Sequence, residues 1–510
     1  MRMNKLKIFF ALLVAIISTG LYAQDQPKGE KVELLGANEL EGITINGQPV
    51  RKLKGNVAFK QKDLYLYCDS AYQYPNKNSI EAFGNVRMNQ GDTITLTGNK
   101  LTYNGDTKKA EVRNNVVLKD RKMTLTTDFL DYDVNTKVAA YYNGGTIVDE
   151  ENKLSSRQGV YSTQTKIFKF KKDVHIENIQ KGYTIDSDTL HYNTTTKIAT
   201  FKAPTKIVNK SGTLYADSGD YDTVNGVSIF QGRSRVVSGN YILEGKRIYY
   251  DQKRDMGVVE GDVKITAIKD SVIITGQTAH YWGNQGISKV SGNPVMKSFP
   301  EGDTLFLSAD TLISIDNEAA GEKKLLAYNQ TKIFKSDLQG KCDSLVYNMA
   351  DSIIYFYNDP ILWSGENQIS ADSINIELVN NKINKMNLST NSFLISEDTL
   401  ANFNQVKGKK MTAFFVNNEL ERVHVDGNSE SIYFALEDDK VVIGMNKAEC
   451  SNMIIKFENR KVNAISFLTK PDASFIPPHE IQGPEKSLKG FKWRIKEKPD
   501  KAAVLKQTSL

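Results

Sequence analysis

Apolar and polar residues alternate along most of the chain, and the side that carries the apolar residues changes at regular intervals. In residues 123–133, Met123 and Leu125 occupy odd positions, whereas Leu130 and Tyr132 occupy even positions. Successive side chains of a strand point to opposite faces, so the apolar side stays inside only if the strand bends or bulges between these pairs. The pattern therefore predicts bent β-strands that pass from one sheet into another.

The same pattern recurs as a repeat. Its template is a pair of alternating apolar residues, a polar slot that is usually Asp, then an apolar residue and a Tyr. The slot occurs thirteen times between Asp69 and Asn446, at spacings of 29–37 residues, and Gly-Asn-Val or Gly-Asp-Val at 84–86 and 261–263 marks the second arm. We predict an all-β, elongated, two-sheeted β-jellyroll or solenoid of about thirteen repeats, each with two bent antiparallel arms.

The two ends of the chain differ from the repeats. Residues 1–23 combine three basic residues, the apolar run IFFALLVAII and a small residue at Ala23, which is the layout of a signal peptide cleaved near Ala23. The repeat array is predicted over 24–470, with regular repeats to about residue 300 and longer turns after it. Residues 471–510 form a basic, proline-containing C-terminal tail, which is either disordered or a docking segment for an anionic headgroup or a partner protein.

Charge argues against nucleic acid as a partner. The chain carries 66 Lys and Arg against 60 Asp and Glu, a net charge of +6. Removing the signal peptide (3 basic) and residues 480–510 (8 basic, 4 acidic) leaves 66 − 3 − 8 = 55 basic and 60 − 4 = 56 acidic residues. A neutral body lacks the concentrated basic face that phosphate binding needs. The three cysteines are too few and too scattered for a disulfide framework, and free thiols are predicted.

The acidic residues do not form a catalytic or metal site in this interpretation. Asp128, Asp131 and Asp133 recur at 217, 220 and 222, but Arg157 and Lys246 occupy the same slot in other repeats, and an essential ligand would not be exchanged for a cation. Asp and Asn suit corners because their short side chains bond nearby backbone groups. The histidines show no metal-binding or triad spacing. We therefore expect no catalytic residue, no metal and no cofactor.

The repeated motifs resemble the OstA-like family. The residues that carry the resemblance are the Asp-x-Leu-x-Tyr segment at 188–192 and the Gly-Asn/Asp-Val segments at 84–86 and 261–263, behind a signal peptide. The resemblance covers about residues 32–470 and implies an LptA-type periplasmic β-jellyroll of lipopolysaccharide transport. It also implies an apolar groove for the acyl chains of lipopolysaccharide, end-to-end strand pairing with other jellyroll proteins, and an outer-membrane partner. The array is longer than is usual in that family, and no outer-membrane barrel pattern follows it.

The groove residues expected from the template are the apolar positions on either side of the slot. They are Leu96, Leu101, Tyr103, Leu125, Leu130, Tyr132, Ile185, Leu190, Tyr192, Ile248, Tyr250 and Ile274. The same residues could instead fill a closed core, so the sequence leaves two alternatives open. One is a secreted structural or adhesin-type β-solenoid scaffold. The other is a polysaccharide-degrading enzyme on a β-helix, against which no paired acids confined to one or two rungs are found.

Overall fold

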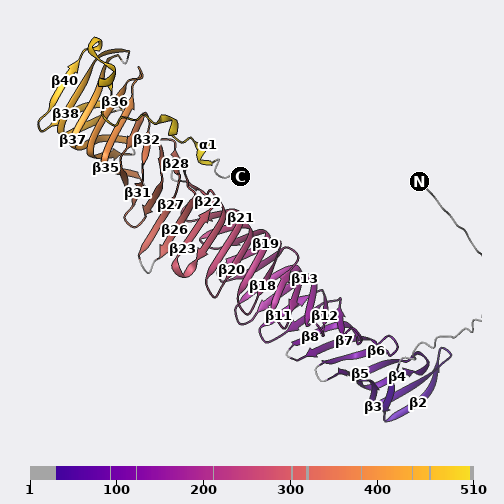
Figure 1. Cartoon of the computed structure of the whole chain (residues 1–510). Helices are drawn as coiled ribbons and strands as arrows, with labels where there is room; N and C mark the ends of the chain where they lie inside the picture. The colour runs from indigo at the N-terminus through magenta and orange to yellow at the C-terminus, as the bar shows by residue number, and fades with distance from the viewer. Residues whose placement is uncertain are drawn as a thin grey trace, which may run out of the picture. The chain divides into compact units, whose positions relative to one another are not determined.

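The computed structural model describes residues 30–505 except 92–93, 122, 211, 300–302, 318–320, 381, 418, 439 and 459–460. The predicted signal peptide lies outside these residues. The chain divides into two compact units, Met1–Ala139 and Ala140–Leu510, each of which is described by itself. In both units nearly all regular structure is antiparallel β-sheet, as the alternation predicted (Figure 1). The described part of the chain contains no helix of the length and hydropathy needed to cross a bilayer.

Unit 1 is a series of long strands, most of which pair with the next one along the chain. Its strands are β1 (Glu33–Gly36), β2 (Glu39–Ile45), β3 (Gln48–Gln61), β4 (Leu64–Tyr74), β5 (Ser79–Gln90), β6 (Ile94–Asn104), β7 (Lys109–Asp120) and β8 (Met123–Asp133), with a short 3-10 turn, η1 (Pro75–Lys77). From β3 to β8 each adjacent pair shows a register shift near its middle. The predicted change of parity is confirmed, because Met123 and Leu125 are buried on one side of the shift and Leu130 and Tyr132 on the other.

The register shift is a β-bulge, at which two residues of one strand lie opposite a single residue of its neighbour. Gly84 and Asn85 of β5 both have positive φ, and they lie opposite the slot region of β4 and β6. The Asn85 side-chain amide donates to Asp69 Oδ2 over 2.9 Å. The slot Asp thus bonds the bulge of the neighbouring strand, which fixes the corner at which each strand bends. The bend divides a strand into two arms that belong to different layers.

Gly84→Ala is expected to lower the free energy of unfolding by about 1–2 kcal/mol, because an alanine is strained at positive φ. Gly84 has φ +73, and a Cβ there would lie 2.5 Å from Asp69 Oδ2. Urea unfolding followed by circular dichroism measures the change. Gly42→Ala in β2 is the control, because a Cβ there meets nothing within 4 Å. Equal losses from both substitutions would contradict this role for the corner.

Unit 2 continues the same strand pattern, but many of its strands are split at the corner into two shorter ones. After β9 (Val138–Tyr141), which spans the division, its elements are β10 (Gly145–Val148), β11 (Asn152–Ser156), β12 (Gln158–Ser162), β13 (Ile167–Asn178), β14 (Tyr183–Asn193), β15 (Ile198–Phe201), β16 (Thr205–Asn209), β17 (Gly212–Ala216), β18 (Ser218–Asp222), β19 (Val227–Val237), β20 (Tyr241–Asp251), β21 (Met256–Ala267), β22 (Val272–Trp282), η2 (Gly283–Gln285), β23 (Ile287–Ser291), β24 (Val295–Ser298), β25 (Leu305–Ser308), β26 (Thr311–Asn317), β27 (Glu322–Tyr328), β28 (Thr331–Lys335), β29 (Leu338–Cys342), β30 (Ser344–Asn348), β31 (Ile353–Tyr357), β32 (Ile361–Ser364), β33 (Asn367–Ser370), β34 (Ser373–Val379), β35 (Lys382–Glu397), β36 (Phe403–Val416), β37 (Glu419–Glu437), β38 (Val441–Glu458), β39 (Lys461–Leu468) and β40 (Asp472–Ile476). It ends in η4 (Pro478–Glu480), η5 (Gly483–Lys486), η6 (Ile495–Glu497) and α1 (Lys501–Leu505).

The strand pairing sorts unit 2 into two layers. β14 illustrates the sorting, because its first arm pairs with β16 and its second arm pairs with β15. The first layer continues from β16 through β17, β24, β25, β28, β29, β32 and β33 to β40, and the second from β15 through β18, β23, β26, β27, β30, β31 and β34 to β39. Between these, the long strands contribute one arm to each layer. The predicted two-sheeted architecture is confirmed.

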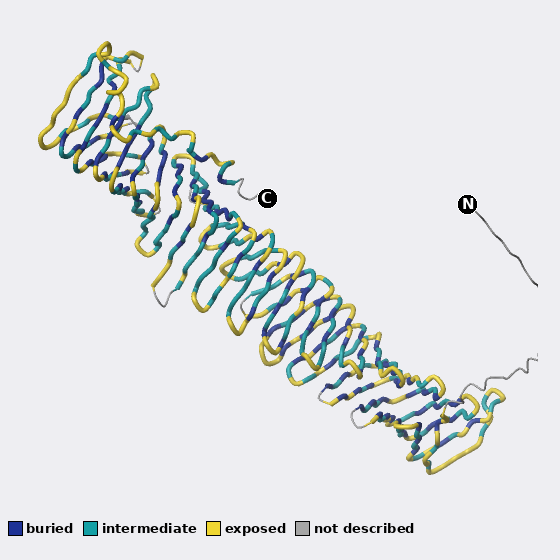
Figure 2. Tube along the Cα trace, in the orientation of Figure 1, coloured by how far each residue is buried: buried dark blue, intermediate teal, exposed yellow. Residues whose placement is uncertain are grey.

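Apolar side chains of the two layers face each other and form the interior. From β24 to β38 this interior is a continuous core that includes Leu307, Leu362, Leu388 and Met411. Figure 2 shows buried positions recurring along the strands of both units. A cavity between the layers near β33 to β39 has a volume of only 20 Å³, so this end of the interior is filled.

The C-terminal segment, defined here as residues 477–505, packs on the outer face of the first layer. It runs from β40 past β36, β32 and β28 to α1 (Figure 1). Its Leu488 joins Phe393, Ile395 and Phe434 in a second apolar cluster that is separate from the interior core. β40 begins at Asp472, two residues beyond the predicted end of the array. The described part of the tail is thus ordered and packed on the sheet, and whether it docks a further partner stays a prediction.

Candidate functional site

The predicted groove residues of unit 1 are packed inside. Leu96, Leu101, Tyr103, Leu125, Leu130 and Tyr132 are each exposed by no more than 1%. They lie on the inner faces of the two layers, as the template predicted. Their side chains are covered by their neighbours and are not accessible to solvent. Whether a ligand reaches them stays a prediction.

A hydrogen bond from the repeat tyrosine closes the mouth between the layers in unit 1. The Tyr132 hydroxyl at the end of β8 donates to Gln90 Oε1 at the end of β5, over 2.6 Å, and Tyr103 bonds Gln61 in the same way. Gln61 and Gln90 are themselves buried. The tyrosine lies on one layer and the glutamine on the other. Each bond therefore joins the two layers at the edge that lies farthest from the corner.

Unit 2 begins with the same closure. Ile185, Leu190 and Tyr192 of β14 are buried. The Tyr192 hydroxyl accepts a hydrogen bond of 3.4 Å from the Asn152 side chain, which also bonds Asn178 over 2.9 Å. Burial raises the pKa of Tyr192, so its phenol stays protonated at neutral pH. The interior of unit 2 is therefore closed at β14.

From β17 to β22 the interior is no longer sealed. Within the first layer, each of these strands pairs an apolar residue with an apolar residue of the next strand. Paired residues share one face of a sheet, so together they form a continuous apolar ladder on the inner face. Five successive rungs of it are only half-buried: Leu214, Val236, Leu243, Ile265 and Ile274. The rungs before and after them, Ile207 and Met296, are buried. We call the inner face of β17–β22 the accessible segment.

The second layer is also exposed along the accessible segment. Tyr250 and Tyr281 lie on one ladder with Gly257 between them. Tyr250 is half-buried and Tyr281 is 41% exposed. The Tyr250 hydroxyl donates to Asp255 Oδ1 over 2.9 Å, within its own turn rather than across to the other layer. The bond that closes the mouth elsewhere is thus replaced by a local one.

The bottom of the interior stays closed beneath the accessible segment. Phe230, Ile248, Val259 and Ala279 form the ladder next to the corner on the second layer, and all four are buried. The accessible segment is therefore a half-buried apolar face with a buried floor and two tyrosines at its outer end. Of the predicted residues, it contains Ile248, Tyr250 and Ile274.

Such a face can hold an apolar chain, because the phenols at its outer end are uncharged. Burial raises the pKa of Tyr250 and Tyr281, and nearby Asp255 raises both further, so the phenols stay neutral at physiological pH. Within the part of the chain that the structure describes, no three His, Cys, Asp or Glu side chains converge as metal ligands do. The three cysteines are free and buried, as predicted.

The acidic triplet at 128–133 is structural in each of its members. The Asn115 backbone N–H donates to Asp128 over 3.2 Å at the corner. Asp131 pairs with Arg113 over 2.8 Å, and Asp133 accepts from the backbone of the following turn. The corner interpretation of these acids is therefore supported by their contacts.

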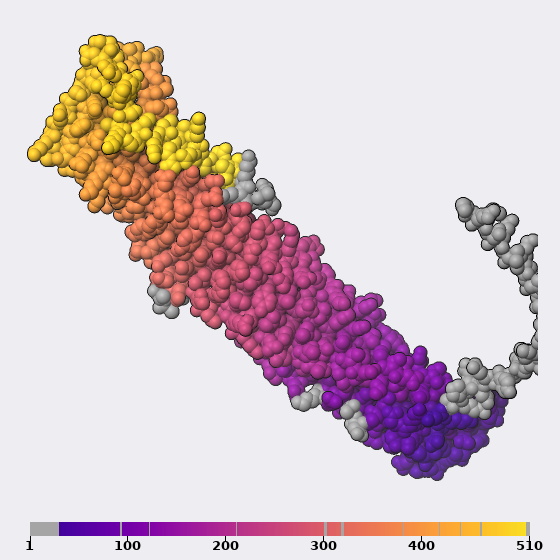
Figure 3. All heavy atoms as spheres, in the orientation of Figure 1, coloured from indigo at the N-terminus to yellow at the C-terminus, as the bar shows by residue number. Residues whose placement is uncertain are grey.

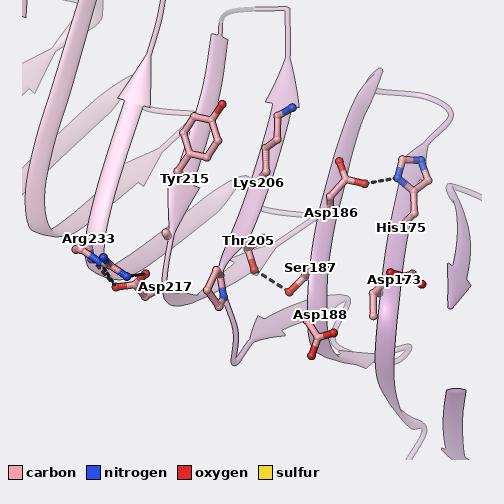
Figure 4. A pocket seen from close by; sticks show the side chains of 13 residues that line it. Asp173, His175, Asp186, Ser187, Asp188, Thr205, Lys206, Tyr215, Asp217 and Arg233 are labelled. Carbon is pink, nitrogen blue, oxygen red and sulfur yellow. Dashed lines mark hydrogen bonds and ion pairs between the residues drawn. The ribbon is translucent and has the colours of Figure 1, made fainter. Parts of the chain in front are cut away.

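A cavity of 770 Å³ lies beside the corner of β13–β19 (Figure 4). Its wall is charged: His175 Nδ1 lies 2.6 Å from Asp186, and Arg233 lies 3.3 Å from Asp217. Its charged side chains are four acids, Asp173, Asp186, Asp188 and Asp217, with Lys206 and Arg233, and most of them are solvated. This wall does not suit an acyl chain, and the pairing of its charges points to a salt-bridged outer surface.

Sequence reasoning missed most of the accessible segment. Leu214, Val236, Leu243 and Ile265 follow the same alternation as the buried rungs, so nothing in the residue types distinguishes them. The available signal was Gly257, a residue without a side chain in the ladder between two tyrosines. Elsewhere in that ladder the residues paired with tyrosines are Phe168 and Ala199. Both have a side chain, and both are buried.

Comparisons with known proteins show what part of the chain is similar to. No curated protein matches the sequence. A solved structure of LptH from Pseudomonas aeruginosa, described as the LptA-homologous periplasmic component of lipopolysaccharide transport, is 17% identical, with a TM-score of 0.21. The match covers 23% of this chain and 82% of LptH, and a score this low does not by itself establish a common fold. The family model of OstA-like proteins matches residues 29–188 and 179–269. Over residues 29–269, the chain is therefore similar to the OstA-like family.

Proposed function

We propose that this protein is a non-catalytic lipid carrier that shields the acyl chains of lipopolysaccharide on its inner apolar face during transport to the outer membrane. The observation that carries the proposal is the accessible segment, where five successive apolar rungs are half-buried above a closed floor. The match of residues 29–269 to the OstA-like family supports the choice of lipid.

The physical basis of binding is burial of hydrocarbon. Each methylene removed from water contributes about 0.8 kcal/mol, so ten methylenes against the ladder contribute about 8 kcal/mol before the entropic cost of ordering the chain. The aliphatic rungs supply this surface on the first layer. The neutral tyrosines at the rim leave the polar part of the ligand outside, in water.

The location and partners belong to the same proposal. A carrier of this kind acts in the periplasm after cleavage near Ala23, and meets other jellyroll proteins end to end. The outermost described strands support this, because β39 and β40 both pair with β38 and the described residues give neither a second partner. An edge of this kind can accept a strand from another sheet. An outer-membrane protein is proposed as the recipient of the lipid.

A photo-crosslinker at Ile265 is expected to form an adduct with lipopolysaccharide, because this rung faces the accessible segment. The measurement is the mobility shift of the purified protein after irradiation, detected with an antibody to the polysaccharide. The matched control is the neighbouring residue Lys264, whose side chain faces the outside and pairs with Glu244. A crosslinker at Leu130, which is 0% exposed, is expected to give no adduct.

A second candidate function is a structural scaffold with a filled interior. The observation that favours it is the sealed interior of unit 1, where the predicted groove residues are fully packed. The crosslinking experiment separates the two functions. Adducts at neither Ile265 nor Leu130 would favour the scaffold and contradict the carrier.

A further inference from the structure

The C-terminal segment is attached to the sheet by glutamine side chains, whose amides hydrogen-bond its backbone as a neighbouring strand would. Gln405 donates to the Lys486 carbonyl over 2.8 Å and accepts from the Leu488 N–H over 2.9 Å. Gln368 repeats this arrangement with the Lys492 carbonyl, over 2.8 Å, and the Arg494 N–H, over 2.7 Å. Each glutamine amide thus satisfies one donor and one acceptor of the segment's backbone, which fixes the segment across the strands.

The apolar side chains of the segment face the sheet. Leu488 is 4% exposed, and Phe491 and Trp493 pack against Phe403 with ring centroids 5.4 and 5.1 Å apart. Val504 of α1 is fully buried. Since these side chains point inward, the polar side chains of the segment are held on the outside.

Some charges of the segment are neutralised within the protein. Arg494 pairs with Glu497 over 2.7 Å and with Asp359 over 2.8 Å, and Lys341 pairs with Glu497 over 2.8 Å. Arg494 and Lys341 lower the pKa of Glu497 to about 2, so this carboxylate stays charged at physiological pH. Glu497 is thereby engaged with cations of its own fold.

Four lysines between residues 486 and 496 remain on the outer surface of the segment. Lys486, Lys489, Lys492 and Lys496 are exposed, and no described side-chain carboxylate pairs with them. Figure 3 shows the C-terminal segment, in yellow, lying on the surface of the preceding strands. The acids beside them on the surface are Glu480, Glu485 and Asp500, and Asp500 accepts from the Ala503 N–H of α1. Ile495 is also 41% exposed within this row.

We propose that these four lysines form a docking surface for an anionic lipid bilayer. The first and last are ten positions apart, which spans up to about 35 Å in an extended chain, so one headgroup cannot contact the whole row. Lysine is a point charge on a flexible stem, without the fork that selects a single phosphate. A charged membrane surface attracts such a row by about 1 kcal/mol per lysine, and the rest of the chain is close to neutral.

Co-sedimentation of the full mature chain with lipid vesicles tests this surface. Vesicles with one quarter phosphatidylglycerol in phosphatidylcholine are compared with pure phosphatidylcholine at low salt. We expect preferential binding to the anionic vesicles. Lys→Gln substitution at 486, 489, 492 and 496 is expected to weaken it at least tenfold, since about 1 kcal/mol per lysine is roughly fivefold each.

The matched control removes four exposed lysines from β13–β16 and the turn between them, by Lys→Gln substitution at 169, 171, 202 and 206. This variant is expected to bind as the unaltered chain does. An equal loss in both variants would mean that net charge alone is responsible and would overturn the proposal. Competition by millimolar inorganic phosphate would also overturn the proposal. So would tighter binding to a DNA duplex that the four Lys→Gln substitutions weaken to the same extent. Lipopolysaccharide crosslinking at Ile265 is unchanged in the four-lysine variant, so this surface can fail without the carrier function failing.

Discussion

Gly257→Trp is expected to reduce lipopolysaccharide binding at least tenfold while the protein stays folded. Gly257 lies between Tyr250 and Tyr281 on the inner face of the second layer. A Cβ there would have only ordinary van der Waals neighbours, the nearest at 3.6 Å, and the backbone does not have positive φ. The substitution therefore does not strain the backbone, and it adds an indole on the face that the acyl chain is proposed to occupy. Binding of a fluorescent lipopolysaccharide measures the change.

The control for this substitution is Val258→Trp. Val258 is the next residue of β21 and points to the opposite face of the layer, so the same bulk is added outside the interior. Lipid binding is expected to be unchanged in this variant. Unfolding curves of both variants show whether the fold is kept. Equal binding by the Gly257→Trp variant and the unaltered chain would place the lipid elsewhere.

Releasing the C-terminal segment is expected to make two buried thiols reactive. Leu488→Ala with Trp493→Ala removes apolar contacts that hold the segment on the first layer, a loss of at least about 3 kcal/mol. The first layer then lacks its outer cover over β28–β38, and local opening exposes Cys342 and Cys450, which belong to the interior core. We expect their reaction with a thiol reagent at pH 8 to accelerate roughly a hundredfold, which is that free energy expressed as a rate.

Cys68 is the internal control in the same molecule. It is buried in unit 1, and burial raises its pKa to about 12, as it does for Cys342. Both thiols are therefore protonated and slow to react in the closed protein. Mass spectrometry of labelled peptides follows each cysteine separately. If Cys68 accelerated as much as the other two, the substitutions would have loosened the whole protein, and the segment would not be a local cover.

The fold of the repeats was predictable because the alternation has a period of two and the corner has a fixed place within it. The change of parity between Leu125 and Leu130 required a bulge, and each adjacent pair of strands from β3 to β8 has a register shift near its middle. The structural role of the acids followed from their exchange with Arg157 and Lys246. Both conclusions concern neighbouring residues, whose relation the backbone geometry largely determines.

The sequence by itself determined which side chains face inward. Leu130 and Ile265 both face inward, yet one is sealed in and the other is half-buried. Only the tertiary structure decided this, because the difference depends on whether a tyrosine reaches an amide on the opposite layer, as Tyr132 reaches Gln90, or an acid in its own turn, as Tyr250 reaches Asp255. The same holds for the C-terminal segment, which the sequence left as either disordered or a docking segment. Its attachment to Gln368 and Gln405 joins residues more than 80 positions apart, a distance over which alternation carries no information.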